Sequence, residues 1–302
     1  MYGYIFLTYI FLLLQSNLTN TQVETQSETD SMWKVWQNER LEKAARLDAL
    51  GAYILLKYVD QSHQLDTAII LAKQLEQEGR KLGLDCIEGQ GLSLRAFSHL
   101  GQHNYLEAAK IYEKSIPKLE PCSSDFSMAN IYLNIGVCYT SIGLHNEAID
   151  NYQKILTFSE KLQNKDLESA IYINISRSYT LLGQYQAALD YLQKAKALNH
   201  NLEHIHLNLG GVYLDMQQYD SALVNIELAV EGNRKIDNSI NLSRSLFELG
   251  RLKVATGFEE KGLEHYEEAI VIFKELNAMP EIAMAYNDIG TLEFNRNNLR
   301  GS

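Results

Sequence analysis

The stretch ANIYLNIGVCYTSIGLHNEAIDNYQKIL, residues 129–156, decides the fold. It covers all of one segment and part of a second in which apolar residues recur at helical spacing, about 129–142 and 147–162. Gly143, between them, is a residue type that commonly ends a helix. The apolar residues at the start of the second segment fall on one helix face: Ala148, Ile149, Tyr152, Ile155 and Leu156. The pattern predicts two antiparallel amphipathic helices joined by a short turn.

Small residues recur along the chain at a nearly constant interval. Successive members are 40, 40, 40, 34 and 40 residues apart: Ala68, Ala108, Ala148, Ala188, Ala222 and Gly262. Upstream of several of them lies an Ile-Gly or Leu-Gly pair, as in Ile135-Gly136 and Leu249-Gly250. One hairpin cannot bury its own apolar stripe, so we expect successive hairpins to stack and to form a continuous core.

The motifs Ile135-Gly136-x-x-Tyr139 and Leu209-Gly210-x-x-Tyr213, each followed by a small residue in a second helix, resemble the tetratricopeptide repeat. The resemblance covers 49–302 as about six and a half repeats, which start near 49, 89, 129, 169, 203, 243 and 283. It implies an all-α fold, a right-handed α-solenoid of stacked helix-turn-helix repeats. Such long repeats are similar to those of exported bacterial signalling and scaffold arrays. One repeat, from about 169 to 202, has the usual 34 residues, and we expect the six additional residues elsewhere to lengthen the second helix and its loop.

The N-terminal residues differ from the repeats. Residues 2–14 form an apolar run and a polar stretch follows, which predicts a signal peptide over 1–20 and a polar linker over 21–31. We therefore expect export to the periplasm or outside the cell. The alternative is a cytoplasmic protein, because no Lys or Arg precedes the apolar run. Residues 32–48 are expected to form a helix that caps the array.

The last repeat, from about 283, contains a first helix only. Its second-helix small residue is expected at position 302, where the sequence stops. This favours a fragment whose membrane-linked or C-terminal output domain lies beyond it. The alternative is a frayed last helix.

Composition and motifs limit the function classes. Lys and Arg number 27 against 38 Asp and Glu, and the net charge of -11 argues against nucleic acid as a partner. The sequence contains no phosphate-binding loop, nucleophile elbow or His-Glu-x-x-His motif, so we predict a non-enzyme without a cofactor. The three cysteines, Cys86, Cys122 and Cys138, form no Cys-x-x-Cys pair, and we interpret all of them as packing residues.

The densest histidine group is His200, His204 and His206. His200 and His204 have the spacing of one helix face, but His200 falls in a predicted loop. We interpret the group as a polar helix start and predict no metal site.

The first helices of the repeats are expected to line the concave wall of the solenoid, where a ligand would bind. The residue before each Ile/Leu-Gly pair is Asn134, Asn174, Asn208, Glu248 or Asp288. An amide both donates to and accepts from a peptide backbone, and the resemblance to long-repeat families implies this role for the three asparagines. The alternative is that they cap or bridge neighbouring helices.

Three arginines are expected to add a basic spot to this groove. Arg177 and Arg251 have the same register two repeats apart, and Arg244 lies seven residues before Arg251 on one helix face. Such a spot would bind a carboxylate, although ordinary ion pairs with adjacent helices are an equal alternative. We include His204 in the groove. The predicted function is a protein- or peptide-binding scaffold, and the alternative is the sensory input of a sensor kinase, nucleotide cyclase or transcription regulator.

Overall fold

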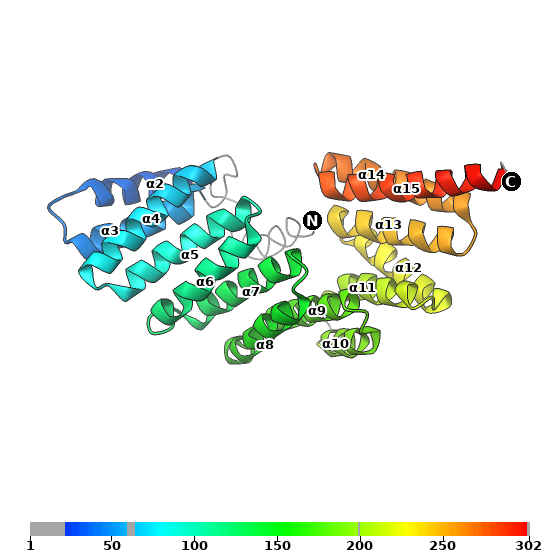
Figure 1. Ribbon diagram of the computed structural model, residues 1–302, viewed down its shortest axis with the longest axis horizontal. Coiled ribbons are helices and arrows are strands. Elements are labelled where there is room, and N and C mark those ends of the chain that lie inside the picture. Colours follow the sequence, from blue (N-terminus) through cyan, green and yellow to red (C-terminus); the bar gives the residue numbers. More distant parts are fainter. Residues whose placement is uncertain (1–21, 59–63, 199, 301–302) are drawn as a thin grey trace. The chain divides into compact units, whose positions relative to one another are not determined.

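The computed structural model describes residues 22–58, 64–198 and 200–300. These residues fold into α-helices joined by short turns, and no β-strand occurs among them (Figure 1). The chain divides into two compact units, Met1–Gln163 and Asn164–Ser302, called unit 1 and unit 2. In each unit, consecutive helices form stacked hairpins, so the predicted all-α solenoid is confirmed.

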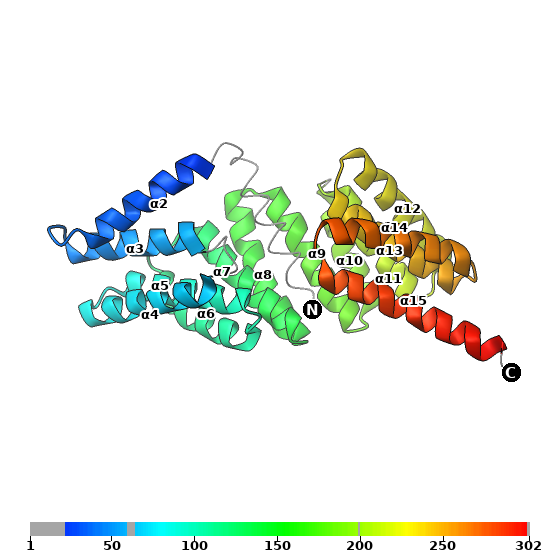
Figure 2. The same ribbon diagram turned by 90° about the horizontal axis from the view of Figure 1, so that it is seen from above.

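The described part of unit 1 forms a capping helix and three hairpins. Its helices are α2 (Gln22–Gln37), α3 (Lys43–Tyr58), α4 (Leu65–Leu82), α5 (Asp85–Gly101), α6 (Tyr105–Leu119), α7 (Asp125–Ser141) and α8 (His145–Leu162). Helix α2 lies along α3 (Figure 2), and Met32, Trp33 and Trp36 pack against the cluster around Leu47 and Leu50.

The capping helix begins and ends earlier than predicted. Helix α2 already includes most of 21–31, the expected linker, and it ends at Gln37, whereas the cap was expected over 32–48. The helix that starts at Lys43 is instead the first helix of the first hairpin. The sequence did not indicate this helix, because residues 22–31 are mostly polar. A helix that covers the end of a stack needs apolar residues on one face only, and the rest of its surface can be polar. The expected signal peptide, 1–20, lies outside the described residues.

Unit 2 contains three hairpins and one further helix. Its helices are α9 (Lys165–Leu181), α10 (Tyr185–Ala197), α11 (Leu202–Asp215), α12 (Tyr219–Lys235), α13 (Ser239–Ala255), α14 (Glu259–Glu275) and α15 (Met279–Arg300). Helices α10 and α11 have 13 and 14 residues, against 17 in each of α12, α13 and α14. The 34-residue repeat therefore has a shorter second helix, as we expected, and the first helix that follows is shorter too, where we had expected a shorter loop.

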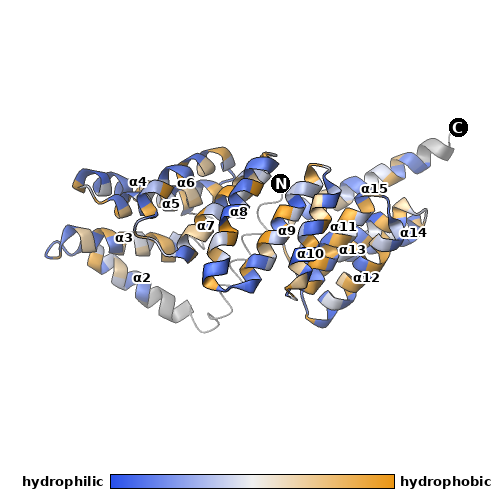
Figure 3. Cartoon of the chain, turned by 90° about the horizontal axis from the view of Figure 1, so that it is seen from below, coloured by the Kyte–Doolittle hydropathy of each residue, from blue (hydrophilic) through white to orange (hydrophobic). Residues whose placement is uncertain are grey.

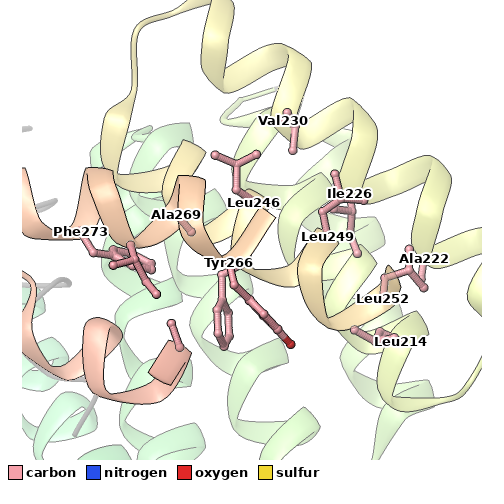
Figure 4. Packing of buried hydrophobic residues seen from close by; sticks show 13 residues of the cluster. Leu214, Ala222, Ile226, Val230, Leu246, Leu249, Leu252, Tyr266, Ala269 and Phe273 are labelled. Atoms are coloured by element: carbon pink, nitrogen blue, oxygen red, sulfur yellow. The ribbon is translucent and has the colours of Figure 1, made fainter. Parts of the chain in front are cut away.

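The repeated small residues mark close contacts between the helices of a hairpin. A Cβ atom added to Gly250 of α13 would lie 2.7 Å from Cδ1 of Tyr266 on α14. Gly136 and Tyr152 stand in the same relation in α7 and α8. Figure 4 shows Tyr266 within the buried cluster of unit 2, beside Leu246 and Ala269. The glycines of the repeated Ile-Gly and Leu-Gly pairs therefore lie where the two helices of a hairpin are in close contact, as the sequence predicted.

Polar and apolar residues alternate around the helices (Figure 3), as the stacking of hairpins requires. The turn after α7 also lies where the sequence predicted it. Gly143 has φ 80° directly after α7, a left-handed conformation that glycine adopts without strain.

The interpretation of the cysteines was wrong for two of the three. Cys86 and Cys122 form a disulfide with a Cα–Cα distance of 6.3 Å. Cys86 lies in the first turn of α5 and Cys122 follows the end of α6, and the antiparallel hairpin brings these two ends together. Cys138 is a buried packing residue as predicted, and burial raises the pKa of its thiol to about 12.

Candidate functional site

Six of the seven predicted groove residues lie on three first helices of unit 2. Helix α9 carries Asn174 and Arg177, α11 carries His204 and Asn208, and α13 carries Arg244 and Arg251. Helix α11 contacts both α9 and α13. We call this surface the first-helix face of unit 2. The seventh residue, Asn134, belongs to α7 of unit 1.

Asn134 has a partner within its own unit. Its Nδ2 donates a hydrogen bond of 3.0 Å to Oη of Tyr112, whose side chain is 1% exposed. A buried phenol oxygen without a partner would cost free energy, so Asn134 satisfies a structural need between α6 and α7. This is the bridging role that we kept as an alternative.

Asn174, at the same register on α9, is different. The residue is 6% exposed, and its Nδ2 is a buried donor without a hydrogen-bond partner. Such a group loses its hydration on folding and gains nothing in return. Asn208, the third asparagine, is half-buried and donates through Nδ2 to the carbonyl oxygen of His204 at 2.8 Å.

Two arginines and a histidine form a second feature of this face, which we call the arginine cluster: Arg177, His204 and Arg244. Burial, together with the nearby guanidinium groups of Arg244 and Arg177, lowers the pKa of His204 to about 3. His204 is therefore a neutral hydrogen-bonding group at pH 7. Arg244 also lies 3.6 Å from Glu281 of α15, whose other carboxylate oxygen, Oε2, is buried without a partner.

Arg251 belongs to a different group, the acidic cluster of Asp215, Glu248 and Asp288. Its guanidinium contacts Glu248 at 2.8 Å and Asp215 at 3.3 Å. Burial raises the pKa of Glu248, and Arg251 opposes that rise. Burial likewise raises the pKa of Asp288, with Arg251 again opposing. The three arginines therefore do not form the single basic spot that the sequence predicted. Arg177 and Arg244 lie near His204, whereas Arg251 is surrounded by three carboxylates.

The acidic cluster borders a shallow cavity of about 340 Å³. Its polar lining includes Arg251, Asp288, Thr291 and Asn295. Sequence reasoning missed Asp215 as a partner of Arg251. The repeat register offered the signal, because these residues are 36 apart in neighbouring first helices, close to one repeat length.

The histidines of the 200–206 segment have separate partners. Nδ1 of His200 lies 2.8 Å from Asp166, and Nδ1 of His206 lies 2.9 Å from Oδ1 of Asn225. Across the residues that the structure describes, no group of three or more His, Cys, Asp or Glu side chains is arranged to hold a metal ion. Nor does any helix of this part combine the length and apolarity needed to cross a bilayer.

Comparison with known proteins agrees with this geometry. A tetratricopeptide repeat family model matches residues 127–199. The fold is similar to the apo form of the quorum sensor NprR from B. thuringiensis, with a TM-score of 0.62, 16% identity and coverage of 88% of this chain and 81% of that one.

Two further solved structures are similar. The apo form of RapI gives a TM-score of 0.59 and 16% identity over 83% of this chain and 77% of RapI. BtubC (BKLC) from P. vanneervenii gives 0.55 and 19% over 70% and 92%, respectively. No sequence among the curated proteins matches the chain significantly. The chain therefore resembles tetratricopeptide-repeat proteins, by sequence over residues 127–199 and by its solenoid fold beyond them.

Proposed function

We propose that the chain is a non-catalytic scaffold that binds a peptide or protein segment on the first-helix face of unit 2. The observation that carries this proposal is the buried, unpartnered Nδ2 of Asn174. An oxygen acceptor from a ligand, such as a peptide carbonyl, would supply the missing hydrogen bond. The amide of Asn208 on the adjacent helix offers a second polar contact to the same segment.

The charges of this face favour a ligand with two different ends. The arginine cluster, around His204, would attract a carboxylate, either a side chain or a free C-terminus. The acidic cluster has three carboxylates and one guanidinium, so it would attract an amine or guanidinium group. The preferred ligand is therefore an extended peptide with an acidic group over α9 and α11 and a basic group over α13 and α15.

A sensory role is the second candidate. NprR is described as a quorum sensor, and a further similar structure is a signal-transduction ATPase with a tetratricopeptide repeat sensor, with a TM-score of 0.54. Under this proposal the first-helix face would be the ligand site of a signalling protein. Ligand binding is common to both candidates, so the same first experiment applies.

Export is also part of the proposal. The apolar run over 2–14 has the length of a secretory signal core. The Cys86–Cys122 disulfide supports an oxidising compartment, since such bonds are rare in the cytosol. Recovery of the chain in the periplasm or culture medium, with Cys86 and Cys122 resistant to alkylation, would support export. Recovery in the cytosol with both thiols reactive would contradict it.

The binding proposal is tested with the full chain and a random library of fluorescent decapeptides, measured by anisotropy. We expect the bound peptides to be enriched in acidic groups near one end. Asn174→Ala and Arg244→Gln should each weaken binding about tenfold. The matched control is Asn134→Ala, which removes an asparagine of the same register in unit 1. Equal loss of binding in all three variants, or no selected peptide, would contradict the proposal.

A further inference from the structure

The two halves of the Cys86–Cys122 disulfide differ in their exposure to solvent. Cys122 is exposed and follows the end of α6, whereas Cys86 is half-buried in the first turn of α5. A thiolate that opens a disulfide must reach one of the two sulfur atoms, so access helps to decide which one it attacks. A thiol from solution therefore reaches the Cys122 sulfur more readily than the Cys86 sulfur.

The helix ends also give the two sulfurs opposite electrostatic surroundings. Cys86 is the second residue of α5, and no side chain caps the start of this helix. The free backbone N–H groups of a helix start stabilise a thiolate. The Cys122 sulfur instead lies 3.6 Å from the carbonyl oxygen of Lys118 and 3.5 Å from that of Leu119, at the end of α6. A thiolate on Cys122 would be repelled by these oxygens.

The charged side chains next to Cys86 do not cancel this preference. The neighbouring carboxylates are those of Asp85 and Glu88. Lys118 of α6 lies 2.5 Å from Asp85 and 2.9 Å from Glu88. Glu88 has a second cationic partner, because Arg80 of α4 lies 2.8 Å from it. Access and electrostatics therefore agree: Cys122 is the sulfur that is attacked, and Cys86 is the better leaving group.

The helix ends that carry the cysteines also contact each other independently of the disulfide. Gly89 of α5 lies so close to α6 that an added Cβ would be 2.7 Å from Cγ of Leu119 and 2.9 Å from Cβ of Lys118. The ion pairs of Lys118 with Asp85 and Glu88 join the same two ends. These contacts keep the two thiols near each other when the bond is open, which gives the closing reaction a high effective concentration.

We propose that Cys122 is a site of reversible S-thiolation, at which a small thiol opens the Cys86–Cys122 disulfide. The thiolate of the small molecule attacks the Cys122 sulfur and forms a new disulfide with it. The bond to Cys86 breaks, and its electron pair stays on the Cys86 sulfur, which leaves as a thiolate at the start of α5. In the reverse reaction, Cys86 attacks the Cys122 sulfur and releases the small thiol.

The exchange needs no further oxidant or reductant, because the protein disulfide is the oxidant and the small thiol is the reductant. The site lies in unit 1, whereas the first-helix face that we propose for peptide binding belongs to unit 2. Thiolation of Cys122 therefore does not depend on that proposed function, and either proposal can fail without the other.

The test uses the folded, oxidised full chain with 2-mercaptoethanol as the probe. After a short incubation at mildly alkaline pH, N-ethylmaleimide captures every free thiol, and peptide mass spectrometry locates both labels. We expect mercaptoethanol on Cys122 and N-ethylmaleimide on Cys86, in about tenfold excess over the opposite arrangement. Equal labelling, or mercaptoethanol mainly on Cys86, overturns the proposal. A disulfide that opens only in urea overturns it as well, because such a bond is purely structural.

Reclosure of the bond gives a second measurement. Equilibrium with mercaptoethanol and its disulfide yields the effective concentration of the two protein thiols. Gly89→Ala separates the helix ends and should lower this concentration about tenfold. Lys118→Gln removes the ion pairs without adding bulk and should lower it about threefold.

The matched control for Gly89→Ala is Gly211→Ala of α11, where an added Cβ meets nothing within 4 Å, and it should leave the effective concentration unchanged. Circular dichroism verifies that each variant is folded. If neither Gly89→Ala nor Lys118→Gln lowers the effective concentration, the helix ends do not hold the thiols together, and the proposed reversibility is refuted.

Discussion

Units 1 and 2 have the same hairpin architecture but differ in the partners of two buried glutamates, Glu88 and Glu248. In unit 1, the buried Glu88 accepts from Arg80 at 2.8 Å and from Lys118 at 2.9 Å. Although burial raises the pKa of Glu88, these cations lower it by more. In unit 2, Glu248 shares Arg251 with Asp215, and burial raises its pKa. The buried carboxylate of Glu88 thus has two cationic partners, whereas Glu248 has one that it shares with Asp215.

The asparagines repeat this difference at one register. Asn134 in unit 1 donates to a buried tyrosine, and Asn174 in unit 2 has a buried donor with no partner. Identical residues at equivalent repeat positions therefore differ in their hydrogen-bond partners. Four predictions compare the two units directly.

The largest expected effect is on the disulfide, which only unit 1 contains among the described residues. Cys86→Ser/Cys122→Ser should lower the free energy of unfolding of unit 1 by about 3–4 kcal/mol, because an unfolded loop of this length loses that much chain entropy when it is closed. Hydrogen exchange resolved by peptide should show the loss in α5 and α6, with α13 and α14 unchanged. A uniform loss across both units would contradict the assignment to unit 1.

The second prediction concerns close backbone contacts. A Cβ on Gly91 of α5 would meet backbone atoms of α4, at 2.8 Å from Cα of Glu76 and 2.9 Å from the oxygen of Ala72. Gly91→Ala should therefore cost about 2–3 kcal/mol in urea unfolding. In unit 2, Gly211 of α11 has nothing within 4 Å of an added Cβ, so Gly211→Ala should stabilise by about 0.5–1 kcal/mol. Two changes of the same sign would refute this contrast.

The third prediction uses the opposite pKa shifts of two glutamates. Glu88→Gln should cost about 2 kcal/mol at pH 7, because it leaves two cations without their shared carboxylate, and Glu248→Gln should change stability by less than about 0.5 kcal/mol.

The pH dependence of the two variants should differ as well. The folded pKa of Glu88 is lowered, so its contribution is present above its unfolded pKa near 4.5 and is lost as the pH falls through the folded value. The folded pKa of Glu248 is raised, so protonation as the pH falls towards 4.5 favours the folded state. Urea unfolding of both variants and the wild type between pH 7 and 3 measures these slopes. Parallel slopes in all three proteins would contradict the prediction.

The smallest effect is expected for the two asparagines. Asn134→Ala should lower stability by about 1 kcal/mol, because it leaves the hydroxyl of Tyr112 without its donor. Asn174→Ala removes a donor that has no partner and should be neutral within about 0.5 kcal/mol. Thermal unfolding of both variants gives the comparison. A larger loss for Asn174→Ala would assign it a structural role and would weaken the binding proposal.

Much of the fold could be predicted from the sequence because the repeats make the same contact between their two helices. Gly136, Gly250 and their partners Tyr152 and Tyr266 recur at a fixed spacing since two helices can approach closely only where one of them lacks a side chain. The helix boundaries around Gly143 followed from the same pattern. The capping helix did not, because its position depends on tertiary contacts of Trp33 and Trp36 and not on a repeat.

Less of the candidate site than of the fold could be predicted from the sequence. The sequence identified Asn174 and Asn134 as equivalent, but it could not tell which one has a partner, because that depends on Tyr112 lying opposite Asn134. The sequence also grouped Arg251 with Arg177, because the two have the same register. It did not show that Asp215, on another helix, pairs with Arg251. The Cys86–Cys122 bond was missed because the cysteines were judged by spacing and not by which helix ends a hairpin joins.

The Cys86–Cys122 bond also determines how the chain would respond to force. The residues between its two sulfurs include nearly all of α5 and α6, and the sequence separation is 36. A fully extended segment of this length would add about 120 Å of contour, and the closed bond withholds that extension. Under oxidising conditions, pulling on the two ends of the chain would release the other hairpins and leave this one as a short inextensible link.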